Sequence, residues 1–178
     1  MYDCNLYIKR ENDMNRVSKH NYYLDIAETV AERGTCMRRL FGAIIVKDDV
    51  IVSTGYNGAP RGRKNCSDLG FCIRQQMNIP RGERYEMCRS VHAEANAIIS
   101  ASRRDMIDAT IYIVGIEAST GEIVANSNSC AMCKRTIINS GIKNVVALQG
   151  TAMTSDQISL LKKLRVKVIL CLDNDNAG

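Results

Sequence analysis

Hydrophobic and polar positions along the first third of the chain predict one helix followed by two strands. Residues 22–33 place apolar side chains at helical spacing, and Gly34 follows as a helix stop signal. Residues 40–46 and 50–56 are short apolar runs rich in branched side chains, which is typical of strands. The polar residues 47–49 between them supply a turn, so we expect the two strands to form a hairpin.

The second half of the chain alternates between helical and strand patterns. Helices are expected at residues 91–102, 131–140 and 155–164, and strands at residues 110–116, 144–148 and 166–172. In the first of these helices Ala95, Ile98 and Ile99 are expected to face inward, and Gly141 ends the second. Such alternation implies crossover connections and a largely parallel sheet. Together with the hairpin it predicts an α/β fold, a three-layer α/β/α sandwich with a mixed sheet of about five strands.

Between these regular parts lies a long segment of a different kind. Residues 57–90 contain four glycines, both prolines of the chain, three cysteines, and seven basic residues against three acidic ones. A loop of this length in a compact domain is usually functional or is held in place by something. We therefore expect a polar N-terminal arm at residues 1–18 and one domain at residues 19–178 that carries this loop.

Composition excludes several broad classes of protein. The chain has 178 residues, of which 46% are apolar and 24% charged, so wholesale disorder is not expected. No apolar run approaches the roughly 18–20 residues that cross a bilayer, and the N-terminus lacks the apolar core of a signal peptide. The net charge of +5 suits a phosphate-bearing ligand, whereas 5% aromatic residues and no Trp weigh against a nucleic-acid surface.

Eight cysteines are an unusual number for a chain without an export signal. We expect a cytoplasmic protein, in which thiols stay reduced and clustered cysteines more often bind metal or take part in chemistry. Cys4 and Cys171 stand apart from the other cysteines and are expected to be spare thiols.

Two short motifs carry the candidate chemistry, each at the start of a predicted helix. These are His92-Ala93-Glu94 and Cys130-Ala131-Met132-Cys133. Residues three apart on a helix share a face, so both sulfurs can reach one ion, to which His92 can add a nitrogen. Three protein ligands leave the fourth tetrahedral position of zinc open, as in catalytic rather than structural sites. Taken alone, the cysteine pair would also fit a redox pair or half of a structural zinc site.

Glu94 follows His92 by two residues, so its side chain should diverge from the metal ligands and still reach a water beside the metal. Zinc lowers the pKa of such a water from 15.7 towards ~7, and a nearby carboxylate can accept the proton. We expect Glu94 to move protons rather than bind the metal. The alternative is a carboxylate that only stabilises the helix start.

The two motifs resemble the signature of the zinc-dependent cytidine and deoxycytidylate deaminases, H-x-E followed by C-x-x-C. Thr35-Cys36 and the runs at 42–46 and 54–58 are similar to the deoxycytidylate branch, so the resemblance covers roughly residues 20–170. It implies a cytidine deaminase-like catalytic domain. The implied zinc ligands are His92, Cys130 and Cys133, with Glu94 as the proton shuttle.

The resemblance also implies substrate contacts and partners. The side chain of Asn57 would contact the nucleotide and the backbone of Ala93 would meet the base carbonyl, although Asn-Gly is a turn signal in any protein. The implied reaction is the hydrolytic deamination of dCMP to dUMP and ammonia. The implied assembly is a homo-oligomer, often a hexamer, with dCTP and dTTP as effectors and without membrane partners.

Two features depart from the family pattern. Ser129 stands where the family has proline before the first cysteine, and its hydroxyl is expected to cap the following helix instead. Residues 117–128 are longer than the usual connection, and Ser119-Thr120-Gly121 predicts a turn within them. We expect a small hairpin there, which either borders the substrate entrance or is an exposed excursion.

Four further cysteines lie in or beside the long loop and form a candidate second metal site: Cys36, Cys66, Cys72 and Cys88. Four thiolates complete a structural zinc site, and a metal would explain how so long a loop stays ordered. We expect a second zinc ion here. The alternative is a set of buried free thiols.

Two other functions stay open on the sequence alone. A tRNA adenosine deaminase shares the zinc motif, although it needs RNA contacts that the charge and aromatic content do not favour. A zinc-stabilised regulatory module without activity would keep the metal ligands, and Ser129 is the only residue that hints at it.

Overall fold

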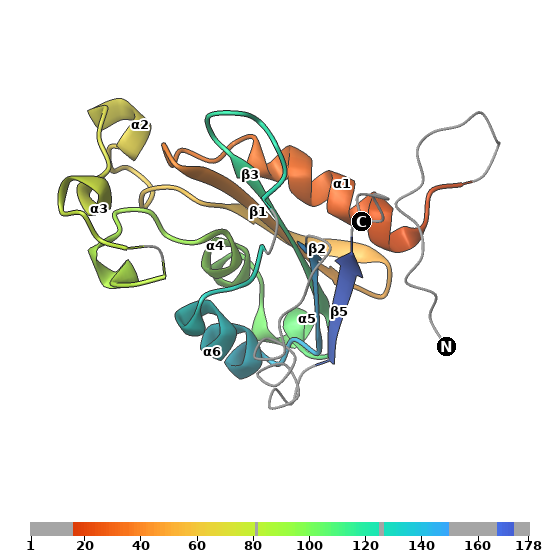
Figure 1. Ribbon diagram of the computed structural model, residues 1–178. Coiled ribbons are helices and arrows are strands. Elements are labelled where there is room, and N and C mark those ends of the chain that lie inside the picture. Colours follow the sequence, from red (N-terminus) through yellow and green to blue (C-terminus); the bar gives the residue numbers. More distant parts are fainter. Residues whose placement is uncertain (1–15, 81, 125–126, 150–166, 173–178) are drawn as a thin grey trace.

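A five-stranded mixed sheet forms the centre of the fold in the computed structural model, which describes residues 16–80, 82–124, 127–149 and 167–172 (Figure 1). Its strand order is β2-β1-β3-β4-β5. The strands are β1 (Arg39–Lys47), β2 (Val50–Tyr56), β3 (Thr110–Glu117), β4 (Asn144–Gln149) and β5 (Lys167–Leu172). Strand β1 is antiparallel to β2 and β3, whereas β3, β4 and β5 are parallel. The predicted hairpin and mixed sheet are confirmed.

One face of the sheet is covered by helix α1 (Lys19–Ala31). The helix begins three residues before the predicted position because Ser18 caps it, accepting a hydrogen bond from the Asn21 backbone N–H at 3.2 Å. Its buried side chains pack on the inward residues of the central strands, and this layer contains Tyr23, Leu24, Ala27, Ala31, Ile44, Val46, Tyr112, Val114, Ile116 and Val146.

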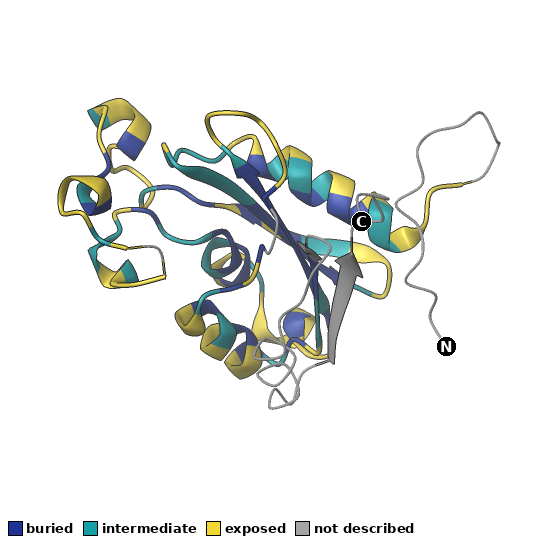
Figure 2. Ribbon diagram, in the orientation of Figure 1, coloured by how far each residue is buried: buried dark blue, intermediate teal, exposed yellow. Residues whose placement is uncertain are grey.

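The opposite face is covered by α4 (Ala93–Ile99), α5 (Arg103–Met106) and α6 (Ala131–Ser140), so the three-layer sandwich is confirmed (Figures 1 and 2). Helix α6 has the predicted bounds, and Gly141 ends it in the left-handed conformation, with φ of 87°. The expected inward orientation of Ile99 is wrong, because the buried face of α4 ends at Ile98 and leaves Ile99 79% exposed. The helix expected at residues 155–164 lies outside the described residues.

The long cysteine-containing segment lies at one end of the sheet and contains three short helices (Figure 1). These are α2 (Cys66–Leu69), α3 (Ile73–Gln76) and a 3-10 helix (Tyr85–Met87). Gly58 and Val91 exchange two backbone hydrogen bonds of 3.2 and 2.8 Å, so the segment leaves the sheet and returns at the same place. That bridge places the next residue, His92, beside the end of β2.

The connection after β3 folds back as expected. The Glu117 backbone N–H donates to Glu122 at 2.8 Å, and Ile116 pairs with Ile123 in an antiparallel bridge. This small hairpin extends β3. No helix in the described part of the chain is long and apolar enough to span a bilayer.

Two glycines allow the helices to approach the sheet closely, one on each face. At Gly55 of β2 a Cβ atom would overlap the backbone of Ala93 and Ala97 in α4, and at Gly42 of β1 it would overlap the backbone of α1. The position of each helix therefore depends on the absence of a side chain at one strand residue.

We expect Gly55→Ala to lower the free energy of unfolding by about 1–3 kcal/mol, because α4 must move away from the strand or the strand must bend. Gly42→Ala should do the same through α1. Thr54→Ala, an exposed neighbour on β2, should stay within about 0.5 kcal/mol of the wild type. Urea unfolding measures all three variants, and an unchanged free energy of unfolding in Gly55→Ala would contradict the close packing of α4 on β2.

Candidate active site

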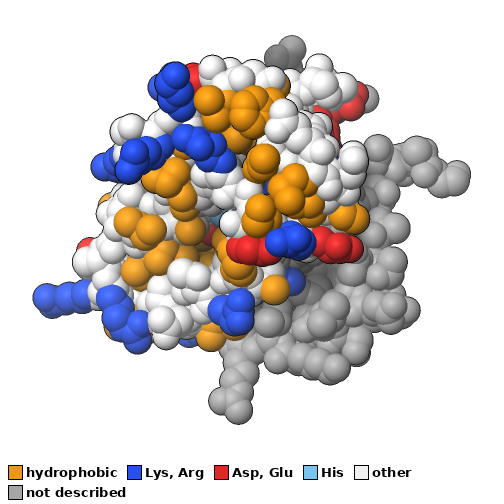
Figure 3. All heavy atoms as spheres, turned by 90° about the vertical axis from the view of Figure 1, so that its left-hand side faces the viewer, with side chains coloured by type: hydrophobic (Ala, Val, Ile, Leu, Met, Phe, Trp, Pro, Cys, Tyr) orange, Lys and Arg blue, Asp and Glu red, His pale blue; other side chains and the backbone are white. Residues whose placement is uncertain are grey.

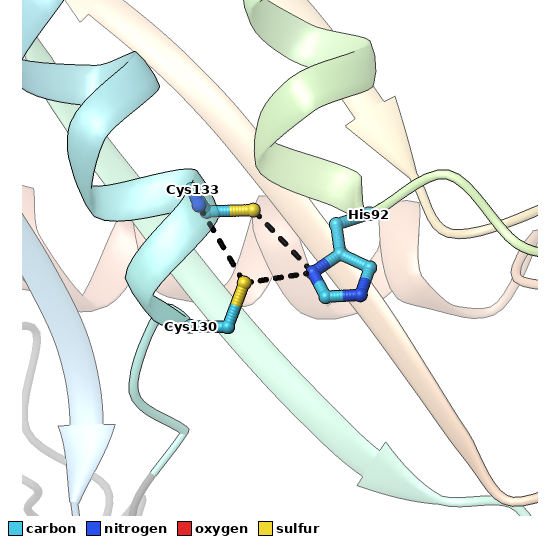
Figure 4. A group of neighbouring side chains, drawn as sticks. All are labelled: His92, Cys130 and Cys133. Atoms are coloured by element: carbon cyan, nitrogen blue, oxygen red, sulfur yellow. Dashed lines mark hydrogen bonds between the residues drawn. The ribbon is translucent and has the colours of Figure 1, made fainter. Parts of the chain in front are cut away.

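The first residues of two helices meet above the sheet (Figure 4). His92 is the N-cap residue of α4, and its extended backbone continues from the bridge at Val91. Cys130 is the N-cap residue of α6, and its sulfur accepts the backbone N–H of Cys133 at 3.5 Å. Because the N-cap sulfur turns back over the first turn, both cysteines face the histidine.

The three side chains form a metal-ligand set. The His92 Nδ1 atom lies 3.4 Å from the sulfur of Cys130 and 3.4 Å from that of Cys133. All three ligand atoms lie within 4.8 Å of one another. Ligands about 2.0–2.3 Å from a tetrahedral zinc ion lie about 3.5 Å apart, so this arrangement fits zinc and leaves one position without a protein ligand.

Hydrogen bonding within this cluster shifts the pKa values of the two thiols in opposite directions. The hydrogen bond from Cys133 is the main cause that lowers the pKa of Cys130, to about 3, and the same bond raises the pKa of Cys133. The bond to Cys130 also raises the pKa of His92, although burial opposes it. Hydrogen bonding thus favours the thiolate form at Cys130 and the protonated form at Cys133, and a bound metal would take the place of the thiol proton.

Glu94 lies beside the cluster without being part of it. Glu94 as a whole is 5% exposed, and its carboxylate is close enough to Cys133 to raise the pKa of that thiol further. It also lines the same pocket as His92 and Cys130. Glu94 is therefore placed to exchange protons with a molecule next to the metal.

The two predicted substrate contacts also line this pocket, but Asn57 has a structural role as well. Its Oδ1 accepts the backbone N–H of Phe41 at 2.8 Å, and its Nδ2 donates to the backbone oxygen of Arg39 at 2.8 Å. One amide hydrogen and one carbonyl lone pair remain for a ligand. Ala93 is fully buried at the first turn of α4, where backbone N–H groups lack partners within the helix.

The pocket opens on the face that carries the cysteine-containing segment, and Figure 3 shows this face hollowed at its centre with hydrophobic side chains around the hollow. Several lining residues carry no sequence motif and were missed by the sequence patterns: Arg38, Arg39, Phe41, Arg74, Tyr85, Ser90 and Asn128. The rings of Tyr85 and His92 meet at right angles, with ring centres 5.0 Å apart. Asn128 brings the end of the predicted hairpin connection to the pocket wall.

The candidate second metal site is only partly assembled. Burial raises the pKa of Cys66, and the thiols of Cys36, Cys72 and Cys88 raise it further, so the four groups are neighbours. No three of these four sulfurs lie within 4.8 Å of one another; among the described residues only the His92 cluster reaches that. Cys36 and Cys88 line the active-site pocket, which places this group against its wall.

Ser129 does not cap α6, so that expectation is wrong. The N-cap position and the capping bond belong to Cys130. The Ser129 side chain is buried, and its hydroxyl has no hydrogen-bond partner among the described residues. The sulfur of Cys130 thus performs the capping that the sequence assigned to the preceding hydroxyl.

Comparison with known families agrees with this geometry. A family model described as the cytidine and deoxycytidylate deaminase zinc-binding region matches residues 17–149, and the chain therefore belongs to this family of zinc-binding deaminases. A second model, described as Toprim-like, matches residues 131–178, which is well under half of the chain.

Individual relatives place the chain in the deoxycytidylate deaminase branch. The deoxycytidylate deaminase of Mycobacterium phage D29 is 37% identical over 138 residues, covering 75% of this chain and 96% of that protein. The enzyme of Schizosaccharomyces pombe is 30% identical over 91% of this chain, but the chain spans only about half of it, 47%. A solved structure of the cyanophage S-TIM5 dCMP deaminase with dCMP and dUMP shares the fold, with a TM-score of 0.55 at 22% identity, covering 87% of this chain and 99% of that one.

Removing one ligand should remove the metal of this cluster. We expect Cys133→Ala to lose one zinc ion per chain after dialysis against a mild chelator, because two ligands hold zinc far more weakly than three. Met132→Ala, an exposed neighbour between the two cysteines, serves as the control and should keep the wild-type zinc content. Elemental analysis measures both, and an unchanged zinc content in Cys133→Ala would exclude this cluster as the zinc site.

Proposed function

We propose that this chain is a zinc-dependent hydrolase that converts dCMP and water to dUMP and ammonia. The observation that carries the proposal is the three-ligand cluster of His92, Cys130 and Cys133, with one position left open and a buried carboxylate beside it. Its relatives named deoxycytidylate deaminase support the choice of substrate. The solved structure with dCMP and dUMP bound, a protein of the same fold, supports it further.

Each proposed residue has a distinct task. Zinc, when bound, makes hydroxide available from water at neutral pH. Glu94 would accept the proton of that water on a carboxylate oxygen and pass it to the pyrimidine ring nitrogen as the new C–O bond forms. It would then take the remaining proton of the new hydroxyl group and deliver it to the exocyclic nitrogen, so that the carbonyl forms, the C–N bond breaks and ammonia leaves.

Two groups would hold the base in place for this reaction. The backbone N–H of Ala93, at the first turn of α4, would donate to the base carbonyl. The remaining amide hydrogen of Asn57 would contact the nucleotide, and the two bonds of Asn57 to β1 would keep the amide fixed in one orientation. In this proposal residues 19–178 form one catalytic domain, and residues 1–18 precede it.

The proposal extends to assembly and location. We propose a homo-oligomer, a hexamer by analogy with the family, with dCTP and dTTP as effectors. Large apolar side chains exposed on α4 and α6, including Ile99 and Ile138, support an interface there. The six cysteines among the described residues are all free thiols, which supports a reducing compartment such as the cytoplasm.

Glu94→Gln provides the test of the mechanism. The amide cannot accept a proton, so deamination of dCMP should fall by about 10²–10⁴-fold or more while the zinc content and the unfolding midpoint stay at wild-type values. Glu122→Gln makes the same change at an exposed residue of the small hairpin; it is the matched control and should keep full activity. Ammonia release measures both variants, and wild-type turnover by Glu94→Gln would reject the proposed proton shuttle.

We also propose a structural zinc ion held by Cys36, Cys66, Cys72 and Cys88. Its binding would draw together four thiols that already interact and would hold the segment 57–90 against the pocket. The active protein should then contain two zinc ions per chain.

The variant Cys72→Ser tests this second ion. It should lose one zinc ion per chain and unfold more readily, because the ligand set would lack one of its two buried cysteines. Cys4→Ser, at a thiol that the sequence predicts to be spare, should retain both ions. Elemental analysis decides the matter, since a single zinc ion per chain in fully active wild-type protein would exclude the second site.

A further inference from the structure

Arg74 carries a buried positive charge that takes part in no ion pair among the described residues. Its side chain, on the short helix α3, is 6% exposed. The guanidinium group stays charged in proteins, and a buried charge is costly unless it is paired. None of the ion pairs between described residues includes Arg74. The hydrogen bond from Arg84 is the main cause that lowers the pKa of Glu86, and the charge of Arg74 adds to it, but Glu86 is exposed and forms its ion pair with Arg84 rather than with Arg74.

The contacts of Arg74 use only part of its hydrogen-bonding capacity. Its Nη2 donates to the backbone oxygens of Pro80 and Glu83, at 2.8 and 2.6 Å. Its Cζ lies 4.5 Å from the centre of the Tyr85 ring. Its Nε, by contrast, is buried and has no hydrogen-bond partner among the described residues. Such an unsatisfied donor on a charged group indicates that a partner is missing.

The position of Arg74 indicates which partner that is. Arg74 lines the same pocket as His92 and Glu94. Of the other arginines in the pocket, Arg39 is paired with Glu117, with its Nε 2.6 Å from the carboxylate. Arg38 has no ion pair within the described chain but is half-exposed, so solvent can screen its charge. Arg74 is thus the buried arginine of the pocket that forms no ion pair within the described residues.

We propose that Arg74 binds the 5′-phosphate of the substrate and so makes the enzyme specific for nucleoside monophosphates over nucleosides. A phosphate dianion supplies a counter-charge for the guanidinium group and acceptors for N–H groups other than those that Nη2 already donates. Tyr85 holds the guanidinium group from one side, and the carbonyl oxygens of Pro80 and Glu83 fix it from another. This inference rests on the proposed function, since it assigns a specificity role within the same pocket.

A purely structural role for Arg74 predicts a different experimental result from a role in phosphate binding. If Arg74 only fastens the loop around Pro80 and Glu83, its loss disturbs the pocket for every substrate alike. If it binds phosphate, its loss affects only substrates that carry one. The comparison of dCMP with deoxycytidine in the same variant distinguishes the two roles.

The central experiment is therefore the kcat/KM of Arg74→Met for both substrates. We expect a fall of about 10–100-fold for dCMP, because a charge-assisted hydrogen bond is lost, and a change of less than about threefold for deoxycytidine. Arg63→Met, an exposed arginine of the same segment, is the matched control and should change neither value. Equal losses for the two substrates, or no loss for dCMP, would overturn the proposal.

Arg74→Lys keeps the experiment decisive if the methionine variant fails to fold. Lysine retains the charge but not the planar group, so it should lose part of the preference for dCMP and retain the rate with deoxycytidine. A lysine variant that loses both rates equally would again indicate a structural role.

A measurement of inorganic phosphate binding tests the role of Arg74 independently of the proposed reaction. Isothermal titration of zinc-loaded wild-type protein with phosphate should show binding that weakens about tenfold or more in Arg74→Met and not in Arg63→Met. Equal affinity in the wild type and Arg74→Met would overturn the assignment of Arg74. Absence of ammonia release from dCMP by the wild type would instead overturn the proposed function, whatever the titration gives.

Discussion

The active site depends on two helices starting at the same point above the sheet. Helix α4 is held there by the bridge between Gly58 and Val91 and by its contact with Gly55 of β2. Helix α6 begins alongside, and its N-cap cysteine turns its sulfur towards His92. Because a metal tolerates little error in ligand position, the close packing of helix against strand is what allows residues 38 positions apart to act as one site.

The electrostatics of this cluster explain why it suits a cation. Two sulfurs and a ring nitrogen in a half-buried position share protons through hydrogen bonds, and these bonds favour the thiolate form of Cys130. A divalent ion placed among them satisfies that negative charge and displaces the proton of the second thiol. Glu94 raises the pKa of Cys133 in the metal-free cluster, so it is near enough to act on a molecule at the open position.

Much of this could be predicted from the sequence, because regular periodicity and short motifs are local. The five strands and the bounds of α6 follow from apolar runs and from Gly141, and the metal ligands follow from their spacing. The predictions that Ile99 faces inward and that Ser129 caps α6 were wrong. Both depended on where a helix ends or begins, and a shift of one or two residues decides that. Arg74 could not be singled out, because its burial depends on the path of an irregular loop rather than on any periodic pattern.

The pocket therefore has two walls with different sources of order. One wall consists of strands and helices that share the apolar core, and it carries the metal ligands and Glu94. The other consists of the loop with Arg74 and Tyr85, which contributes no described residue to the two apolar core clusters and has Cys88 beside the pocket. A wall without a core can change its substrate contacts while the chemistry on the rigid wall stays the same. The proposed phosphate contact of Arg74 lies on the loop wall, whereas the residues proposed for the bond-breaking steps lie on the wall that shares the core.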